Sequence, residues 1–333
     1  MQESVKLQPI KTILQPLNDQ LTKLPSMIAR LNLTHVLLLP VFLLVVIFSS
    51  CKREDSQTSE QERQASVASG EADGEAEVVF NAVFDDVMGV NDTVGIRGTG
   101  AFGRNFAANT GGGPGTERPN ACYTVTISQT TNFPFPKQIV IDFGTTGCLG
   151  PDGHTRRGKI IALYTNHLLV PGAMVTTTFD NFYLDSIKVE GLHKIKNTGT
   201  GAPSLTRQFT VDVLEGRLSK PNGNYIKWNS HKVITQFEGL VTHDFRDDIF
   251  RIEGSGNGQV KKGNLLVNWQ SNITEPLVKK FTCRWLVKGR IRTVRGNNIL
   301  NSSWVTVIDF GAGNCDNQAV LTINGVSHNI TLP

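Results

Sequence analysis

Regular alternation of apolar and polar side chains is the feature that most limits what this chain of 333 residues can fold into. The run Val175-Thr-Thr-Thr-Phe-Asp180 shows it clearly, and the same period of two recurs at 187–191, 209–213 and 283–288. Successive side chains of a strand point to opposite faces, so this pattern predicts half-buried strands. No helical pattern separates the runs, which favours an antiparallel all-β fold over residues 121–333.

Turn signals lie between these runs. Combinations of Gly with Pro, Asp, Asn or Glu stand at 151–153, 215–216, 221–223 and 324–325. The last pair, Asn-Gly, is flanked by two alternating segments and predicts a type I′ hairpin over residues 320–332. The expected architecture is an antiparallel meander that forms either a sandwich or a curved sheet.

One short helix is expected before the strands. Residues 92–120 are rich in Gly and predict an irregular loop, so residues 78–120 form a helix followed by a Gly-rich loop. The segment Gly98-Thr-Gly-Ala-Phe-Gly103 matches a dinucleotide-binding motif by letter, but that motif needs a strand before it and a helix after it. The helix is predicted from apolar residues that recur at helical spacing: Val79, Phe80, Val83, Phe84, Val87 and Met88.

Cys51 ends an apolar run and predicts a lipoprotein signal. Residues 35–48 are apolar, two serines follow, and charged residues begin directly after the cysteine. A transmembrane helix is the competing interpretation, but it needs about 20 apolar residues and this run is shorter and contains Pro40. A start at Met27 would give a leader of ordinary length, so residues 1–26 are interpreted as a misassigned start within a signal peptide of residues 1–50.

Charge is distributed unevenly along the remainder of the chain. Residues 52–77 carry three basic and eight acidic groups, a net charge of −5, and few large apolar side chains. With Cys51 they are predicted to form a lipidated, disordered tether (51–77). Residues 78–333 carry 26 basic and 19 acidic groups, a net charge of +7. Such a surface suits lipid phosphates or acidic glycans, although solubility alone also explains it. Nucleic-acid binding is not expected, because no concentrated basic helix is present.

An internal echo divides the β region into two related units that bracket a central meander. Both Ile141-Asp-Phe-Gly-Thr-Thr-Gly-Cys148 and Ile308-Asp-Phe-Gly-Ala-Gly-Asn-Cys315 contain I-D-F-G, three residues and a cysteine. A further cysteine precedes each, at Cys122 and Cys283. The echo favours disulfides Cys122–Cys148 and Cys283–Cys315. Zinc is the alternative, but no C-x-x-C pair exists. Each I-D-F-G aspartate is expected to accept backbone N–H bonds at a strand end, with Gly supplying an unusual backbone angle.

Candidates for a chemical site are few. His243, Asp244, Asp247 and Asp248 gather an imidazole and three carboxylates, which suits metal binding or acid–base chemistry but is more typical of an exposed turn. The basic segment 154–159 suits a phosphate or carboxylate, or else forms a charged hairpin. No catalytic nucleophile motif and no metal-spaced ligand set is present, and no cofactor is expected. The four tryptophans form either a sugar-stacking platform or, for most of them, core: Trp228, Trp269, Trp285 and Trp304.

Several of these segments together resemble a known family. The chain is similar to uncharacterised Bacteroidota envelope lipoproteins over about residues 77–333. The resemblance implies a lipid-anchored envelope protein with an all-β body, and it supplies no activity and no catalytic residues. The segments that carry it are the cysteine box at Cys51, Ile141–Gly144 with Cys148, Asp152-Gly153, 157–161, 176–181, 188–191 and Cys315-Asp-Asn317.

The sequence therefore predicts a non-enzymatic protein, lipid-anchored at the outer membrane on its periplasmic or cell-surface side, with a binding or structural role. Its partners are the membrane, through the lipid, and an envelope protein or glycan. The alternative is a secreted hydrolase acting on glycans, which would need two carboxyl groups about 5–10 Å apart across a cleft.

Overall fold

The computed structural model describes the backbone of residues 33–91, 93–95, 99–102, 122–129, 131–201, 206–242, 245–295 and 305–332, and the side chains of these ranges from Glu60 onward, Phe245 excepted. The chain divides into two units, Met1–Gln57 and Thr58–Pro333. In the first unit the described backbone is helical, as part of α1 (Leu33–Gly89). All strands lie in the second unit.

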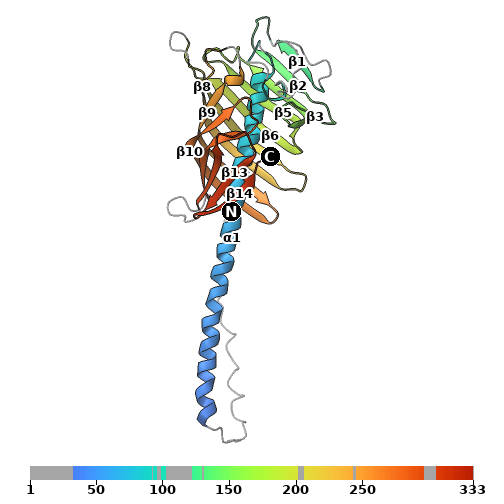
Figure 1. Ribbon diagram of the computed structural model, residues 1–333. Coiled ribbons are helices and arrows are strands. Elements are labelled where there is room, and N and C mark those ends of the chain that lie inside the picture. Colours follow the sequence, from blue (N-terminus) through green and yellow to red (C-terminus); the bar gives the residue numbers. More distant parts are fainter. Residues whose placement is uncertain are drawn as a thin grey trace, which may run out of the picture. The chain divides into compact units, whose positions relative to one another are not determined.

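The second unit contains one antiparallel sheet of fourteen strands in meander order, and the sheet is not closed. The all-β prediction is therefore confirmed, with a single curved sheet in place of a sandwich (Figure 1). The strands are β1 (Thr124–Gln129), β2 (Lys137–Asp142), β3 (Cys148–Leu149), β4 (Thr155–Tyr164), β5 (Met174–Leu184), β6 (Ile187–Asn197), β7 (Gln208–Ser219), β8 (Tyr225–Glu238), β9 (Ile249–Lys262), β10 (Leu265–Lys280), β11 (Leu286–Arg295), β12 (Val305–Ala312), β13 (Gln318–Ile323) and β14 (Val326–Thr331). Short 3₁₀ turns lie at η1 (Gly100–Phe102) and η2 (Phe245–Asp247).

Each long strand buries one of its two faces, as the alternation predicts. In β8, every second residue from Ile226 to Gln236 is buried, while those between them are at least partly exposed. The hairpin predicted at Asn324-Gly325 joins β13 to β14, with φ of +47° and +81° at these two residues. Positive φ at both positions is what a type I′ turn requires.

The helical segment 60–89 packs against the concave face of this sheet and is part of the core (Figure 1). From Ala72 to Gly89 nearly every side chain is buried, whichever way it points. Phe80 stacks on Trp228 of β8, and Phe84 meets Phe209 of β7 edge to face. Strands β4 and β6 to β13 contact the segment, so the curved sheet surrounds much of the helix.

The prediction of a disordered tether is wrong for residues 60–77, which are helical and are largely buried from Ala65 onward. The segment lacks large apolar side chains because close packing leaves no room for them. A Cβ atom on Gly70 would lie 2.7 Å from Thr306 and 2.8 Å from Leu321, and one on Gly74 would lie 3.2 Å from Ile308. Small residues let the helix backbone approach the strands. The predicted helix also begins earlier than residue 78.

The end of the helix is satisfied by side chains from outside it. The last four carbonyls of a helix have no partner within it. Here the hydroxyl of Tyr164 donates to the carbonyl of Val87, one of these four, at 2.8 Å, and that of Thr99 donates to the carbonyl of Asp85, just before them, at 2.6 Å. Most of the predicted Gly-rich loop after Gly89 lies outside the described residues.

The two I-D-F-G units have the same local structure. In each, a cysteine precedes a hairpin whose second strand carries I-D-F-G, and a disulfide closes the base: Cys122–Cys148 around β1–β2 and Cys283–Cys315 around β11–β12. Both predicted pairings are present. We name these the first and second stapled hairpins.

The predicted role of the I-D-F-G aspartates is confirmed as well. The Asp142 carboxylate accepts from the N–H of Gly144, and the Asp309 carboxylate accepts from the N–H of Gly311, both at 2.9 Å. The two glycines have φ of +69° and +96°, in the region that favours glycine. In the first hairpin β2 ends at this point, whereas in the second the glycine lies in β12 at an irregularity in its pairing with β11.

Candidate functional site

Acidic side chains of the helix and basic side chains of the sheet or its turns pair with one another, some in the interior and some at its edge. The acidic excess of residues 52–77 and the basic excess of the following region therefore partly neutralise each other inside one fold. Six such pairs join the helix to the sheet or its turns: Glu62–Arg295, Glu71–Lys262, Glu75–Lys220, Glu77–Lys232, Asp85–Lys279 and Asp86–Arg156. The net charge of +7 read from the sequence is thus not all available at the surface.

Asp73 binds the two largest side chains of the core. The indole N–H groups of Trp228 and Trp269 both donate to Oδ1 of Asp73, at 3.0 and 3.1 Å. All three residues are at most 2% exposed. These two tryptophans are core, as predicted for most of the four, and their N–H groups are satisfied by the helix. Trp285 is partly buried against the core beneath Arg284, and Trp304 lies outside the described residues.

A buried ionic cluster lies at the end of the helix. Nε of Arg156 donates to Asp86 at 2.7 Å, and its two terminal nitrogens donate to Asp152 at 2.9 and 2.6 Å. Burial raises the pKa of Asp86 to about 6, against the opposing effect of the Arg156 guanidinium. The positive charge also suits the partial negative charge of a helix C-terminus. Arg156 is fully buried, so the segment 154–159 is not free to bind a phosphate.

The other residues of that segment are engaged too. Nδ1 of His154 contacts Asp185, and Arg284, from the turn between β10 and β11, reaches Asp185 at 3.8 Å and His154 at 3.4 Å. Arg157 lies over the ring of Tyr183 and Lys159 pairs with Asp142. The curvature of the sheet therefore brings the β3–β4 and β5–β6 turns against the base of the second stapled hairpin. We interpret this cluster as a set of contacts that stabilises the fold.

The predicted cluster of His243, Asp244, Asp247 and Asp248 is described only at its last two residues. His243 and Asp244 lie outside the described residues. Asp247 is exposed and accepts from the hydroxyl of Thr242 at 2.8 Å. The prediction that Asp248 is exposed is wrong: it is 2% exposed and accepts from the Gln236 amide at 2.5 Å. The sequence does not show whether the Asp248 side chain is buried, because the 3₁₀ turn η2 interrupts the alternation of buried and exposed residues just before it.

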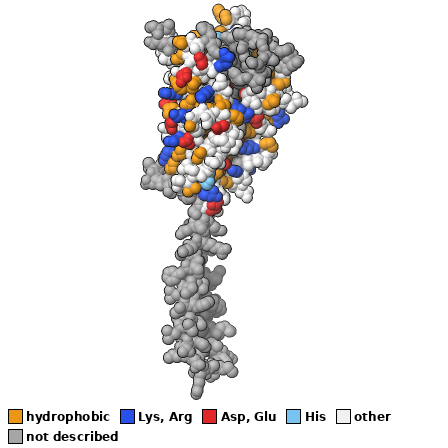
Figure 2. Space-filling view, viewed as in Figure 1, with side chains coloured by type: hydrophobic (Ala, Val, Ile, Leu, Met, Phe, Trp, Pro, Cys, Tyr) orange, Lys and Arg blue, Asp and Glu red, His pale blue; other side chains and the backbone are white. Residues whose placement is uncertain are grey.

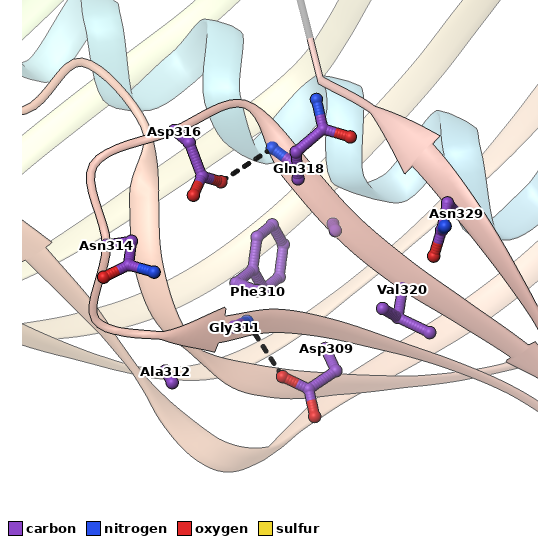
Figure 3. Close-up of a pocket in the computed structure, with 10 residues that line it drawn as sticks. Asp309, Phe310, Gly311, Ala312, Asn314, Asp316, Gln318, Val320 and Asn329 are labelled. Atoms are coloured by element: carbon purple, nitrogen blue, oxygen red, sulfur yellow. Dashed lines mark hydrogen bonds between the residues drawn. The ribbon is translucent and has the colours of Figure 1, made fainter.

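A cavity of about 280 Å³, lined by both polar and apolar side chains, opens on the outer side of the second stapled hairpin (Figure 3). Its walls come from the end of β12, the loop to β13, and the facing residues of β13 and β14. Phe310, which is 2% exposed, lies beneath it. The polar lining residues are Asp309, Asn314, Asp316, Gln318 and Asn329. Of these residues, Asp309 is the one that the sequence marks, and only as a strand-end residue. The polar run 314–318 after I-D-F-G is the signal that marks the other wall.

Two carboxylates, those of Asp309 and Asp316, line this cavity. Partial burial raises the pKa of Asp309, while the Gly311 N–H and the Arg290 guanidinium lower it, and the pKa lies below its ordinary value as a result. A glycosidase needs one carboxyl group with a raised pKa to act as the acid. Asp316 accepts from the Gln318 N–H at 3.0 Å. Within the described part of the chain, no group of three or more His, Cys, Asp or Glu side chains is placed to hold a metal ion.

Comparison with known protein families, with curated proteins and with solved structures found no match to this chain.

Proposed function

We propose that the chain is a lipid-anchored cell-envelope protein with a binding or structural role at the outer membrane. The apolar run that ends at Ser49, Ser50 and Cys51 supports the anchor. Two disulfides are compatible with an extracytoplasmic location. Among the residues whose side chains the structure describes, from Glu60 onward, no helix is long and apolar enough to cross a membrane.

The observation that carries the binding or structural role is the filled concave face. A curved sheet often holds a ligand on its concave side, but here the chain's own helix occupies that side and pairs its charges. Buried charges that are paired and hydrogen-bonded contribute to the fold and are not poised to react. What remains for partners is the outer face, where acidic and basic side chains are interspersed in the visible view (Figure 2).

The anchor is tested by labelling cells that produce the protein with an alkyne analogue of palmitate. The wild-type protein is expected to take up label and fractionate with outer membranes. The Cys51→Ser variant is expected to remain an unlabelled precursor, whereas Ser49→Ala, which keeps the thiol, serves as the matched control. Equal labelling of Cys51→Ser and wild-type protein would refute the anchor.

The binding or structural role is tested separately, with chemical cross-linking in intact envelopes. A protein of this kind is expected to cross-link to a defined envelope partner or to bind envelope glycan. Purified protein is expected to show no turnover on glycan, peptide or ester panels. Turnover that is lost in Asp316→Asn, with the fold retained, would favour the hydrolase alternative.

A further inference from the structure

The cavity of the second stapled hairpin contains hydrogen-bonding groups that the fold does not use. Both oxygens of Asp309 are engaged, by the Gly311 N–H and by Nε of Arg290 at 2.8 Å. By contrast, the amides of Asn314 and Asn329 make no hydrogen bond within the described part of the chain. One oxygen of Asp316 is likewise left over. Figure 3 shows these groups around the opening, on different sides of Phe310. Two amides and one carboxylate oxygen are therefore available to a ligand.

The first stapled hairpin shows what a closed version of the same place looks like. Across the strands, Asp142 is opposite Lys159, which is opposite Asp180. The corresponding row in the second hairpin is Asp309, Val320 and Asn329. Lys159 reaches over the outer face and pairs with Asp142 at 3.0 Å. Val320 cannot do this, and Arg290 approaches Asp309 from the other side instead.

We propose that this cavity binds one sugar unit of a neutral glycan. Amides donate and accept hydrogen bonds and a carboxylate accepts them, which matches neighbouring hydroxyl groups of a sugar. Val320, which is 37% exposed, and Ala312 supply apolar contact for the C–H groups of the ring. The volume is just below the range of about 300–1,000 Å³ typical of small-molecule sites, so it suits a single ring.

The charge of the lining selects against acidic sugars. Arg290 compensates Asp309, so Asp316 is the one carboxylate in the lining without an ion pair within the described part of the chain. A uronate or sulfate group would meet this carboxylate at close range and be repelled. A metal cation would find only one uncompensated carboxylate, which is a poor ligand set for a hard cation. A neutral, hydroxyl-rich ligand fits best.

The test is binding of the full-length protein, in detergent micelles, to an array of neutral oligosaccharides of glucose, galactose, mannose and N-acetylglucosamine, with uronate-containing oligosaccharides beside them. Wild-type protein is expected to bind at least one neutral glycan. Val320→Lys copies the first hairpin by placing a lysine opposite Asp309, and is expected to weaken binding at least tenfold. Asn314→Ala, which removes one free amide, is expected to do the same.

Val326→Lys is the matched control, because it adds the same charge at an exposed valine of β14 that does not line the cavity. It should bind like wild-type protein. Equal binding by Val320→Lys and wild-type protein, binding to uronates alone, or no binding to any neutral glycan would overturn the proposal, as would binding that a chelator abolishes. The inference rests on the proposed binding role at the envelope. Palmitate labelling of Cys51 reports on the anchor independently, so failure here leaves that proposal standing.

Discussion

Replacing Asp73 tests whether residues 60–77 form a core helix or a solvated tether. Asp73→Ala would remove the acceptor of two buried indole N–H groups, those of Trp228 and Trp269. A buried donor left without a partner costs about 1–3 kcal/mol, so the two together cost about 2–6 kcal/mol. That is a large part of the 5–15 kcal/mol that typically separates folded from unfolded states. Asp73→Asn keeps an oxygen acceptor and loses only the charge assistance, so we expect a loss of about 1–2 kcal/mol.

The assay is urea unfolding followed by tryptophan fluorescence, which reports on the two buried indoles directly. The midpoint should fall in the order wild type, Asp73→Asn, Asp73→Ala, with an unchanged slope. Glu71→Ala is the matched control, because its ion pair with Lys262 is exposed and worth less than about 1 kcal/mol. An Asp73→Ala variant within about 0.5 kcal/mol of wild type would mean that the helix is not part of the core.

Three further predictions concern pH, the disulfides and the turn after β8. Burial lowers the pKa of His193 to about 4, from an ordinary 6.5. The contribution of this neutral imidazole to the free energy of unfolding is therefore fully present above pH 6.5, and about 3 kcal/mol of it is lost as the pH falls to 4. The urea midpoints of His193→Phe should lack this loss. Replacing both Cys122 and Cys148 by Ser opens a 26-residue loop and should cost about 3–4 kcal/mol of unfolding free energy, measured in urea against the oxidised wild-type protein. Asp248→Ala removes one of the two acceptors of the buried Gln236 amide N–H groups, the other being the Glu238 carbonyl, and should cost about 1–3 kcal/mol, whereas Asp247→Ala should cost less than about 1 kcal/mol in the same assay.

Much of the sheet was predictable, because its rules are local. A strand with one buried face alternates, and the runs at 175–180 and 209–213 do so in the structure. The Asn324-Gly325 turn and the two disulfides followed from short motifs and from their repetition. The I-D-F-G aspartates were predictable for the same reason: the carboxylate and the glycine that it contacts are two residues apart.

The helix before residue 78 was not predicted, because its stability comes from distant partners. Its buried positions are occupied by Gly, Ala, Ser and acidic residues, which locally resemble a solvated segment. The curvature of the sheet determines which strands contact the helix, and this information is not present in any short segment of the sequence. The opposite net charges of residues 52–77 and 78–333 are a sequence signal for this pairing, although from the sequence alone both sets of charges are expected at the surface. The outer cavity depends in the same way on the register of three strands, where a valine replaces a lysine.

The contacts between the helix and the last strands also limit when during synthesis the protein can finish folding. Thr306 hydrogen-bonds to the carbonyl of Ser66 across 240 residues, and Arg295 binds Glu62 across 233. Synthesis proceeds from the N-terminus, so the helix is made first and the strands that cover this part of it are made last. Contacts so far apart in sequence form slowly. Until β12 and β13 are available, the acidic helix has no finished core to occupy. A chain interrupted before residue 305 therefore lacks part of the wall that its first helix needs.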